Sequence, residues 1–374
     1  MSDQPMSDRS GAPTLTDGTV TLRAHRDGDV DGVTEQSQDP TSIRWTTVPV
    51  PYSLEDGRAF VRRTMPAGWA DGTSWGFAVE AESRYAGTVE LRDEGGGRAE
   101  IAFGSHPWVR GTDTMERACR LLLDWGFDEK DVATVVWHAH LGNWASRRLA
   151  WRLGFSFDGT LRRYVRHRGE LVDGWSGTLL ASDDRQPRAV WLECPVLEAE
   201  GVRLRAWRPS DVPRIVDACN DDRSRQWLGA LPDPYDEAQA LAWLEHQSES
   251  RATGHGVTWA VVEPDDDLAL ASVAFFDYVP EVELEIGYWT HPDARGRGVM
   301  TRAMAEVVRY GFEDLGVRRM TAGAAVGNDA SQHVIGANGF TPWGTERLGT
   351  VVHGGRADLV WSDVLIEEWR ASRR

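Results

Sequence analysis

A turn around residue 296 carries residue types that could hold an anion. From His291 to Thr301 the chain reads His-Pro-Asp-Ala-Arg-Gly-Arg-Gly-Val-Met-Thr. Gly296 and Gly298 have no Cβ, so the backbone can approach phosphate oxygens closely, and the first N–H groups of a following helix would point at the same place. Arg295 and Arg297 add positive charge. This spacing predicts a cradle for a pyrophosphate group.

The segments on either side of the turn must position this cradle. Upstream, glutamates alternate with apolar residues over 281–289, and this period of two predicts a strand. Downstream, apolar residues recur at helical spacing from Met300 to about Tyr310. Peptide dipoles in such a helix favour a negative charge at its first turn. The strand, the turn and the helix together therefore support an anion site.

The chain contains this arrangement twice. Residues 13–183 reappear as residues 195–367, at an offset that grows from 182 to 185 in single-residue steps. Such steps are typical of small loop changes between two copies of one fold, and the period is far too long for a solenoid repeat. We therefore expect a disordered tail over residues 1–12, a first domain over 13–184, a linker over 185–194 and a second domain over 195–374.

Each copy has a similar order of predicted elements. In the second copy we expect strands over residues 202–207, 258–262, 269–276, 281–289, 319–325, 345–352 and 357–366. We expect helices that begin at Ser210-Asp211 and that cover 237–247, 299–310 and 328–338. Antiparallel strands followed by a βαβ unit are typical of an α/β or α+β fold with a mixed sheet.

Composition narrows the classes of partner. The net charge of −17 disfavours nucleic acid, because Lys and Arg contacts to phosphate carry most of that affinity. No apolar run reaches 18 residues and no signal peptide opens the chain, so we expect no membrane partner and a cytoplasmic location. Cys119, Cys194 and Cys219 show neither metal-ligand spacing nor a disulfide pattern, so we expect no metal site.

With these motifs in place, both copies resemble the GNAT superfamily of acetyl-CoA-dependent N-acyltransferases. The turn is similar to the family's acyl-CoA signature, (Gln/Arg)-x-x-Gly-x-(Gly/Ala), on Arg295, Gly298 and Met300, although Met300 departs from the last position. Further motifs resemble the branch that contains ribosomal-protein N-terminal acetyltransferases and their small-molecule relatives: the Arg-Leu-Arg strand at 203–205 with Asp211, Asn328-x-x-Ser331, Gly339-Phe340 and Gly354-x-x-x-Asp358. The resemblance implies two tandem GNAT folds, each a mostly antiparallel twisted sheet flanked by helices.

The resemblance also implies a site for acetyl-CoA, or another acyl-CoA, as co-substrate. The pyrophosphate would bind the backbone amides of Arg297, Gly298, Val299, Met300 and Thr301. The strand before them would splay and pair with the pantetheine arm, which places the thioester near Tyr288, Trp289 and Thr290. Asn328 would contact this arm, and Ser331 would return a proton to the leaving thiolate. Alternatively, Asn328 caps its helix and Ser331 is a polar residue of the first turn.

An amine acceptor needs a group that removes its proton. An amine with a pKa near 10.4 is neutral in only about one molecule in 2,500 at pH 7. Glu281, Glu283 and Glu285 would share one strand face, and clustered carboxylates raise one another's pKa. The family often places its base on this strand, so we expect Glu285 first and Glu283 second. The alternatives are a solvated strand face and the weaker candidates His291 and His333.

The first copy differs at the cradle. Asp113 stands where the second copy has Gly298. Two unit charges 4 Å apart repel by about 4 kcal/mol at an effective dielectric constant of 20, so this carboxylate would oppose a phosphate. We expect the first copy to bind CoA poorly or not at all. It would then serve as the structural half of an intramolecular pseudo-dimer, which is compatible with a monomeric chain.

The sequence therefore predicts an acyltransferase whose second copy acts. We expect it to transfer an acyl group, most simply acetyl, to an amine by direct attack, because neither copy has a cysteine at the expected thioester position. The negative net charge would oppose an approach to ribosomal RNA, which favours a small-molecule amine as acceptor. The alternatives are a protein or peptide N-terminus as acceptor, and a non-catalytic acyl-CoA-binding or scaffold protein.

Overall fold

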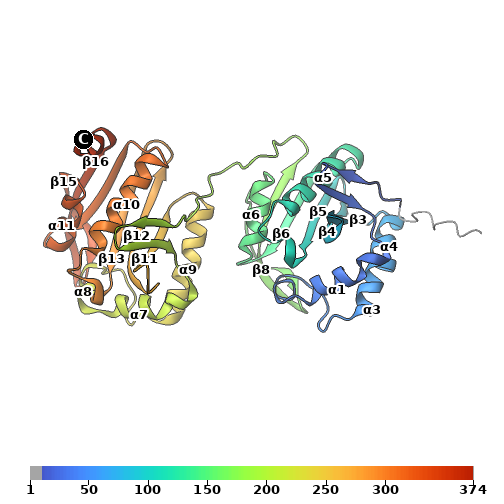
Figure 1. Cartoon of the computed structure of the whole chain (residues 1–374), viewed down its shortest axis with the longest axis horizontal. Helices are drawn as coiled ribbons and strands as arrows, with labels where there is room; N and C mark the ends of the chain where they lie inside the picture. The colour runs from blue at the N-terminus through green and yellow to red at the C-terminus, as the bar shows by residue number, and fades with distance from the viewer. Residues whose placement is uncertain (1–10, 374) are drawn as a thin grey trace, which may run out of the picture. The chain divides into compact units, whose positions relative to one another are not determined.

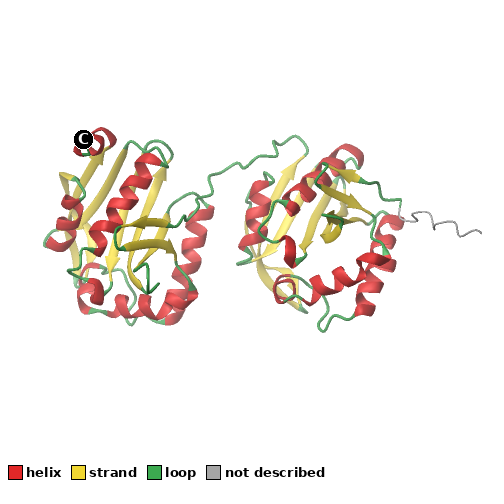
Figure 2. Cartoon of the chain, in the orientation of Figure 1, coloured by secondary structure: helices red, strands yellow, loops and turns green. Residues whose placement is uncertain are grey.

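A computed structural model describes residues 11–373 and divides the chain between Arg188 and Ala189 into two compact units, which we describe one at a time (Figure 1). The tail predicted over residues 1–12 lies mostly outside the described part. Each unit is one mixed sheet flanked by helices, so the predicted fold class is confirmed (Figure 2). No helix within the described residues is both long and apolar enough to cross a membrane.

The second unit is built on an eight-stranded sheet in the order β15-β16-β14-β13-β12-β11-β10-β9. Its strands are β9 (Leu197–Ala199), β10 (Val202–Ala206), β11 (Val257–Val262), β12 (Ala269–Val279), β13 (Glu283–Thr290), β14 (Arg319–Ala325), β15 (Thr341–Val352) and β16 (Gly355–Leu365). All neighbouring strands run antiparallel except β13 and β14, which run parallel. This pair forms the βαβ unit that the sequence predicts.

Helices cover both faces of this sheet. They are α7 (Val212–Asn220), α8 (Asp222–Trp227), α9 (Glu237–Ala252), α10 (Val299–Glu313), α11 (Asp329–Ala337) and α12 (Ile366–Ser372). The apolar stripe of α10 packs in the main core with Leu284 and Ile286 of β13, and α11 adds Ile335 to the same core. Helices α7 and α9 form a separate cluster around Ile215 and Tyr235 on the opposite face.

The first unit repeats this plan, with its eight strands in the order β1-β2-β3-β4-β5-β6-β8-β7. Its strands are β1 (Leu15–Thr16), β2 (Val20–Arg23), β3 (Ser74–Ala81), β4 (Arg84–Gly95), β5 (Arg98–Ser105), β6 (Thr134–His140), β7 (Gly159–His167) and β8 (Glu170–Leu180). Its helices are α1 (Val30–Gln38), α2 (Pro40–Trp45), α3 (Leu54–Ala59), α4 (Met65–Asp71), α5 (Thr114–Glu129) and α6 (Trp144–Arg152). Only β5 and β6 run parallel.

Some predicted boundaries in the second unit are wrong. Glu281 lies outside β13, in a tight turn with φ +60°, where the Val282 N–H donates to the Val279 carbonyl over 3.0 Å. It therefore cannot share a strand face with Glu283 and Glu285. The short helix α8 was not predicted, because its six residues are too few to show a helical period.

A buried ion pair explains the Arg-Leu-Arg motif at the start of the second unit. The Arg205 guanidinium, whose side chain is 4% exposed, donates to both carboxylate oxygens of Asp211 over 2.8 and 2.9 Å. It also donates to Asp267 over 2.7 Å. Arg23 and Asp29 form the same pair in the first unit. The motif thus joins β10 to the start of α7, and its role is structural.

Breaking this pair should destabilise the second unit. Asp211→Ala leaves Arg205 buried with only Asp267, and loss of one partner of a buried ion pair costs about 3 kcal/mol or more. Urea unfolding followed by tryptophan fluorescence measures this loss. Asp233→Ala is the control, because Asp233 pairs with Arg225 at 75% exposure and should contribute less than about 1 kcal/mol. Equal effects of the two substitutions would contradict the structural role.

Candidate active site

The central feature of the second unit is a split between two parallel strands. Residues Glu283–Glu285 of β13 pair with Arg319–Thr321 of β14, and the pairing ends there. Strand β13 continues to Thr290, so its last five residues have no ladder partner on that side. An open strand edge of this kind can take up an extended ligand through its backbone groups.

A glycine-containing turn follows the split strand. Gly296 and Gly298 both lie in the left-handed region, with φ of +73° and +68°. This conformation costs other residues roughly 1–2 kcal/mol, which explains the two glycines. Helix α10 begins at Val299, directly after the turn, and Gly296, Arg297 and Gly298 are exposed. The exposed turn and the helix N-terminus therefore have the form of the predicted cradle.

The two arginines of this turn do not offer free positive charge, contrary to expectation. The Arg295 guanidinium donates to Asp221 over 2.5 Å and to Ser224 Oγ over 2.9 Å, at the start of α8. Arg297 is paired with Glu263. Both side chains are engaged by carboxylates, and Arg110 makes the same contact with Asp39 in the first unit. The side chain of Arg295 thus ties α8 to the turn.

Arg302 is a cation near the turn that the sequence reasoning missed. Its Nη1 lies 3.0 Å from the position that a Cβ at Gly298 would take, and it donates to the Arg297 carbonyl over 3.2 Å. Its buried Nε has no hydrogen-bond partner among residues 11–373. The equivalent Arg117 is paired with Asp113 and Asp17, over 2.6 and 2.9 Å. Comparing these positions between the two copies could have singled out Arg302.

Glu285 differs from Glu283 in its surroundings. Glu285 is the last residue of the paired segment, is partly buried, and has no ion pair in the described part of the chain. Burial, with a smaller effect of Asp277, raises its pKa to about 7. Glu283 is paired with Arg319 over 3.2 Å, and Arg319 also binds Asp363 over 2.9 Å. The geometry therefore favours Glu285 as the base.

The structure brings Tyr288 and Ser331 together across the split. Tyr288 Oη lies 2.9 Å from Ser331 Oγ and donates to the Ser331 carbonyl over 3.0 Å. Burial raises the pKa of Tyr288 to about 12, so the phenol keeps its proton at neutral pH. The sequence placed both residues near the thioester, but no spacing indicated that they form a pair. A protonated phenol beside a hydroxyl can supply a proton to a leaving thiolate.

The remaining predicted residues surround this arrangement in different ways. Asn328 Oδ1 accepts from the Ser331 N–H over 3.3 Å and so caps α11, as Asn143 caps α6 in the first unit. Val299 and Met300 are buried in the core beneath the turn, at 2% and 4% exposure. The others are Thr301, half-buried in the first turn of α10; Thr290, paired with Ala271; and Trp289, whose ring centroid lies 5.6 Å from that of Trp207.

The two histidine candidates have no place in this arrangement. His291 is buried, and its Nδ1 accepts from the Asp293 N–H over 3.2 Å, so it closes the turn after β13. Burial lowers the pKa of its imidazole. His106 accepts in the same way at the first unit's turn. His333 is exposed on α11. The geometry therefore gives His291 a structural role.

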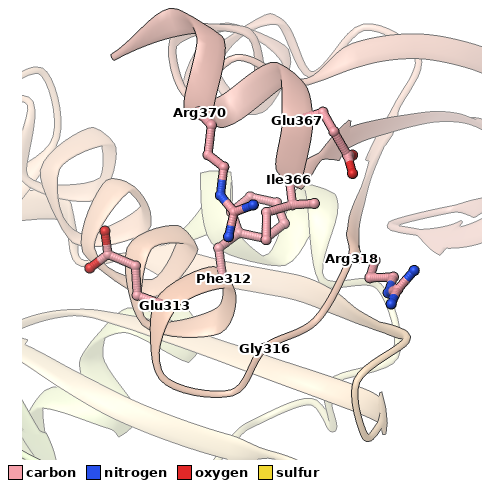
Figure 3. Close-up of a pocket in the computed structure, with 7 residues that line it drawn as sticks. All are labelled: Phe312, Glu313, Gly316, Arg318, Ile366, Glu367 and Arg370. Atoms are coloured by element: carbon pink, nitrogen blue, oxygen red, sulfur yellow. The ribbon is translucent and has the colours of Figure 1, made fainter. Parts of the chain in front are cut away.

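A hollow of about 480 Å³ lies at the far end of α10 (Figure 3). It is lined by Phe312, Glu313, Gly316, Arg318, Ile366, Glu367 and Arg370. The turn lies at the other end of this 15-residue helix, about 20 Å away by the rise of an α-helix. None of the candidate site residues lines the hollow, so we assign it no part in the chemistry.

Comparison with known sequences agrees with this geometry. The family described as "Acetyltransferase (GNAT) domain" matches residues 19–156 and 202–341, which is more than half of the chain. The chain belongs to the GNAT acetyltransferase family. The duplication that the sequence predicts is thus a tandem pair of GNAT domains, and the chain is an N-acetyltransferase by family. The GNAT family uses acyl-CoA, which fits the split strand and the exposed turn.

Three similar proteins each match less than half of this chain. The protein named "Putative ribosomal N-acetyltransferase YdaF" from Bacillus subtilis (strain 168) is 29% identical over 182 residues, which is 46% of this chain and 96% of that protein. "Uncharacterized N-acetyltransferase YoaA" from the same organism is 25% identical and covers 41% and 86%. The solved "Ribosomal-protein-S5-alanine Acetyltransferase from Vibrio fischeri" is 19% identical, covers 47% and 98%, and superposes with a TM-score of 0.42.

Replacing Glu285 should remove the pH dependence of kcat/KM. A base works when deprotonated, so kcat/KM of the natural chain should rise about tenfold per pH unit below the pKa of about 7 and level off above it. Glu285→Gln should lower kcat about 100-fold or more and abolish this inflection, measured as thiol release from acetyl-CoA between pH 5 and 9. Glu283→Gln is the matched control and should keep the inflection.

Stability provides a second readout for the same substitution. Because folding raises the pKa of Glu285, its ionised form opposes folding above pH 7, and this cost vanishes below the ordinary pKa of 4.5. Glu285→Gln should therefore raise the unfolding midpoint at pH 8 and leave it unchanged at pH 4. An inflection that persists in Glu285→Gln would exclude Glu285 as the base.

Removing the phenol hydroxyl should slow the chemical step. Tyr288→Phe keeps the ring in the core but removes the proton donor beside Ser331, so kcat should fall about 100-fold while the Kd for acetyl-CoA changes less than about threefold. Ser331→Ala should have a smaller effect, because the phenol remains. Single-turnover kinetics and calorimetry separate the two quantities. Loss of affinity with unchanged kcat would instead make Tyr288 a binding residue.

Proposed function

We propose that the second unit transfers an acetyl group from acetyl-CoA to the N-terminal amine of a polypeptide. The observation that carries this proposal is Glu285, a carboxyl with a pKa of about 7 at the apex of the split, on the strand that leads into the exposed turn. The relative named as a ribosomal N-acetyltransferase supports a polypeptide acceptor. It favours this alternative over the small-molecule amine that the net charge alone suggested.

Different residues of the second unit would bind acetyl-CoA and transfer protons. The turn Gly296–Thr301 and the N-terminus of α10 would hold the pyrophosphate through backbone N–H groups, with Arg302 beside them. The open edge of β13 would pair with the pantetheine arm. Acyl-CoA supplies an acyl group activated as a thioester. Glu285 would take a proton from the attacking amine, and Tyr288 with Ser331 would return one to the sulfur as the C–S bond breaks and the amide bond forms.

The equivalent positions of the first unit either lack these groups or hold them in other contacts. Phe103 replaces Tyr288, and the Ser146 hydroxyl instead accepts from Trp137 Nε1 over 3.0 Å. Glu100 occupies the place of Glu285, but Arg92 lies 3.6 Å from its carboxylate. Asp113 has φ −83° where Gly298 has +68°, so the turn itself differs. We propose that the first unit neither binds acetyl-CoA tightly nor catalyses transfer.

An acceptor comparison tests the proposed function. The full chain is incubated with acetyl-CoA and either short peptides with free N-termini or small amines, and the products are analysed by mass spectrometry. The proposal predicts acetylation at the peptide α-amine. Gly298→Asp should abolish it by weakening acetyl-CoA about a thousandfold, since a carboxylate 4 Å from a phosphate costs about 4 kcal/mol at a dielectric of 20. Turnover of small amines but not of peptides would contradict the acceptor assignment.

A further inference from the structure

The hairpin of β7 and β8 in the first unit carries an unusual concentration of positive charge. Arg162, Arg163 and Arg166 lie within five residues on β7, and all three are exposed. None of their guanidinium groups has an ion pair or hydrogen bond among residues 11–373, whereas the chain as a whole carries a charge of −17. We name these three residues the basic hairpin.

The basic hairpin is held in place by its neighbours. Arg168, at the hairpin turn, donates to the Ile43 carbonyl over 2.7 Å and so links the hairpin to the α2 segment. The ring centroids of His140 and His167 lie 4.5 Å apart, and those of His138 and Tyr164 lie 5.1 Å apart, which joins β7 to β6. The Nδ1 atoms of His138 and His167 are buried and have no hydrogen-bond partner in the described chain.

The second unit keeps only one of these arginines at the same positions, since Arg347 matches Arg162. Leu348 and Val351 replace Arg163 and Arg166, while Gly323, Ala325 and Val352 replace the three histidines. Arg163 and Leu348 share the same backbone conformation, with φ of +48° and +53°, and their N–H groups donate to Asp173 and Asp358 respectively. The two hairpins therefore share one backbone plan, but β7 of the first unit carries three arginines where β15 of the second unit carries one.

We propose that the basic hairpin binds an acidic polypeptide segment that also carries apolar residues. Arginine forms bidentate bonds with carboxylates, and three unpaired guanidinium groups are available. Leu161, Tyr164 and Leu171 are exposed on the same hairpin, at 36%, 54% and 48%, and offer apolar contacts. The inference rests on the proposed function only in taking the partner to be a polypeptide. The first unit would then capture the protein on which the second unit acts.

A polypeptide fits this surface better than a nucleic acid does. Nucleic-acid affinity comes from many phosphate contacts, and a long polyanion would meet the rest of a chain with a charge of −17. A short segment with a few carboxylates would need only the three arginines and the exposed apolar residues of the same hairpin. The surface thus favours a ligand whose negative charge is confined to a few neighbouring residues.

Binding of a model peptide to the full chain tests the proposal. The probe is a fluorescein-labelled ten-residue peptide of alternating Glu and Leu, titrated without acetyl-CoA and followed by fluorescence anisotropy. The natural chain should bind it, and the triple variant R162Q/R163Q/R166Q should bind at least tenfold more weakly. Affinity should also fall as salt is raised from 50 to 300 mM, because the contacts are ionic.

A matched variant controls for overall charge. R223Q/R318Q/R347Q removes three exposed arginines from the second unit that likewise have no ion pair in the described chain, and should bind the peptide as the natural chain does. Acetylation of a short neutral peptide should be unchanged in R162Q/R163Q/R166Q, so failure of docking is distinguishable from failure of the proposed function. Equal binding by both triple variants, or tighter binding of a ten-nucleotide RNA than of the peptide, would overturn the proposal.

Discussion

The parting of β13 from β14 after Glu285 is the constraint on which the rest of the site depends. A sheet that stayed paired to its end would satisfy every backbone group and leave no edge for a ligand. Here the pairing stops after three residues, and β13 runs on for five more towards the exposed turn. The same point places Glu285 at the apex, half-buried, where loss of water raises its pKa. One break in the ladder therefore leaves an open strand edge that leads to the turn, with a carboxyl of raised pKa beside it.

The first unit has the same break but different side chains around it. Its ladder between β5 and β6 also ends early, after Ile101, while β5 continues to Ser105. What differs is the side chains around the split. Asp113 is paired with Arg117, and Arg92 lies beside Glu100. The indole N–H of Trp137 donates a hydrogen bond to the Ser146 hydroxyl. In each case a side chain that could contact substrate is instead engaged by a neighbouring side chain of the same unit. The fold thus persists in both copies, and we expect the chemistry in only one.

Local patterns predicted the parts of this structure that depend on local physics. The repeat, the mixed sheet and the position of the turn follow from period, composition and glycine, and the structure has them. Partners distant in sequence could not be predicted. Arg295 is 74 residues from Asp221, and Tyr288 is 43 residues from Ser331, so only the packing of α8 and α11 shows that they meet. Glu281 was assigned to the strand because alternation continued into a turn. Its positive φ comes from a tight connection between β12 and β13 that a period of two does not reveal.

We propose that the chain, with its two GNAT folds, has a single acetyl-CoA site. Isothermal titration calorimetry of the full chain with acetyl-CoA tests this claim most directly, because it counts sites without requiring an acceptor. We predict one site per chain. Two equivalent sites per chain, or a single site that survives in Gly298→Asp and is lost on substitution in the first unit, would contradict it.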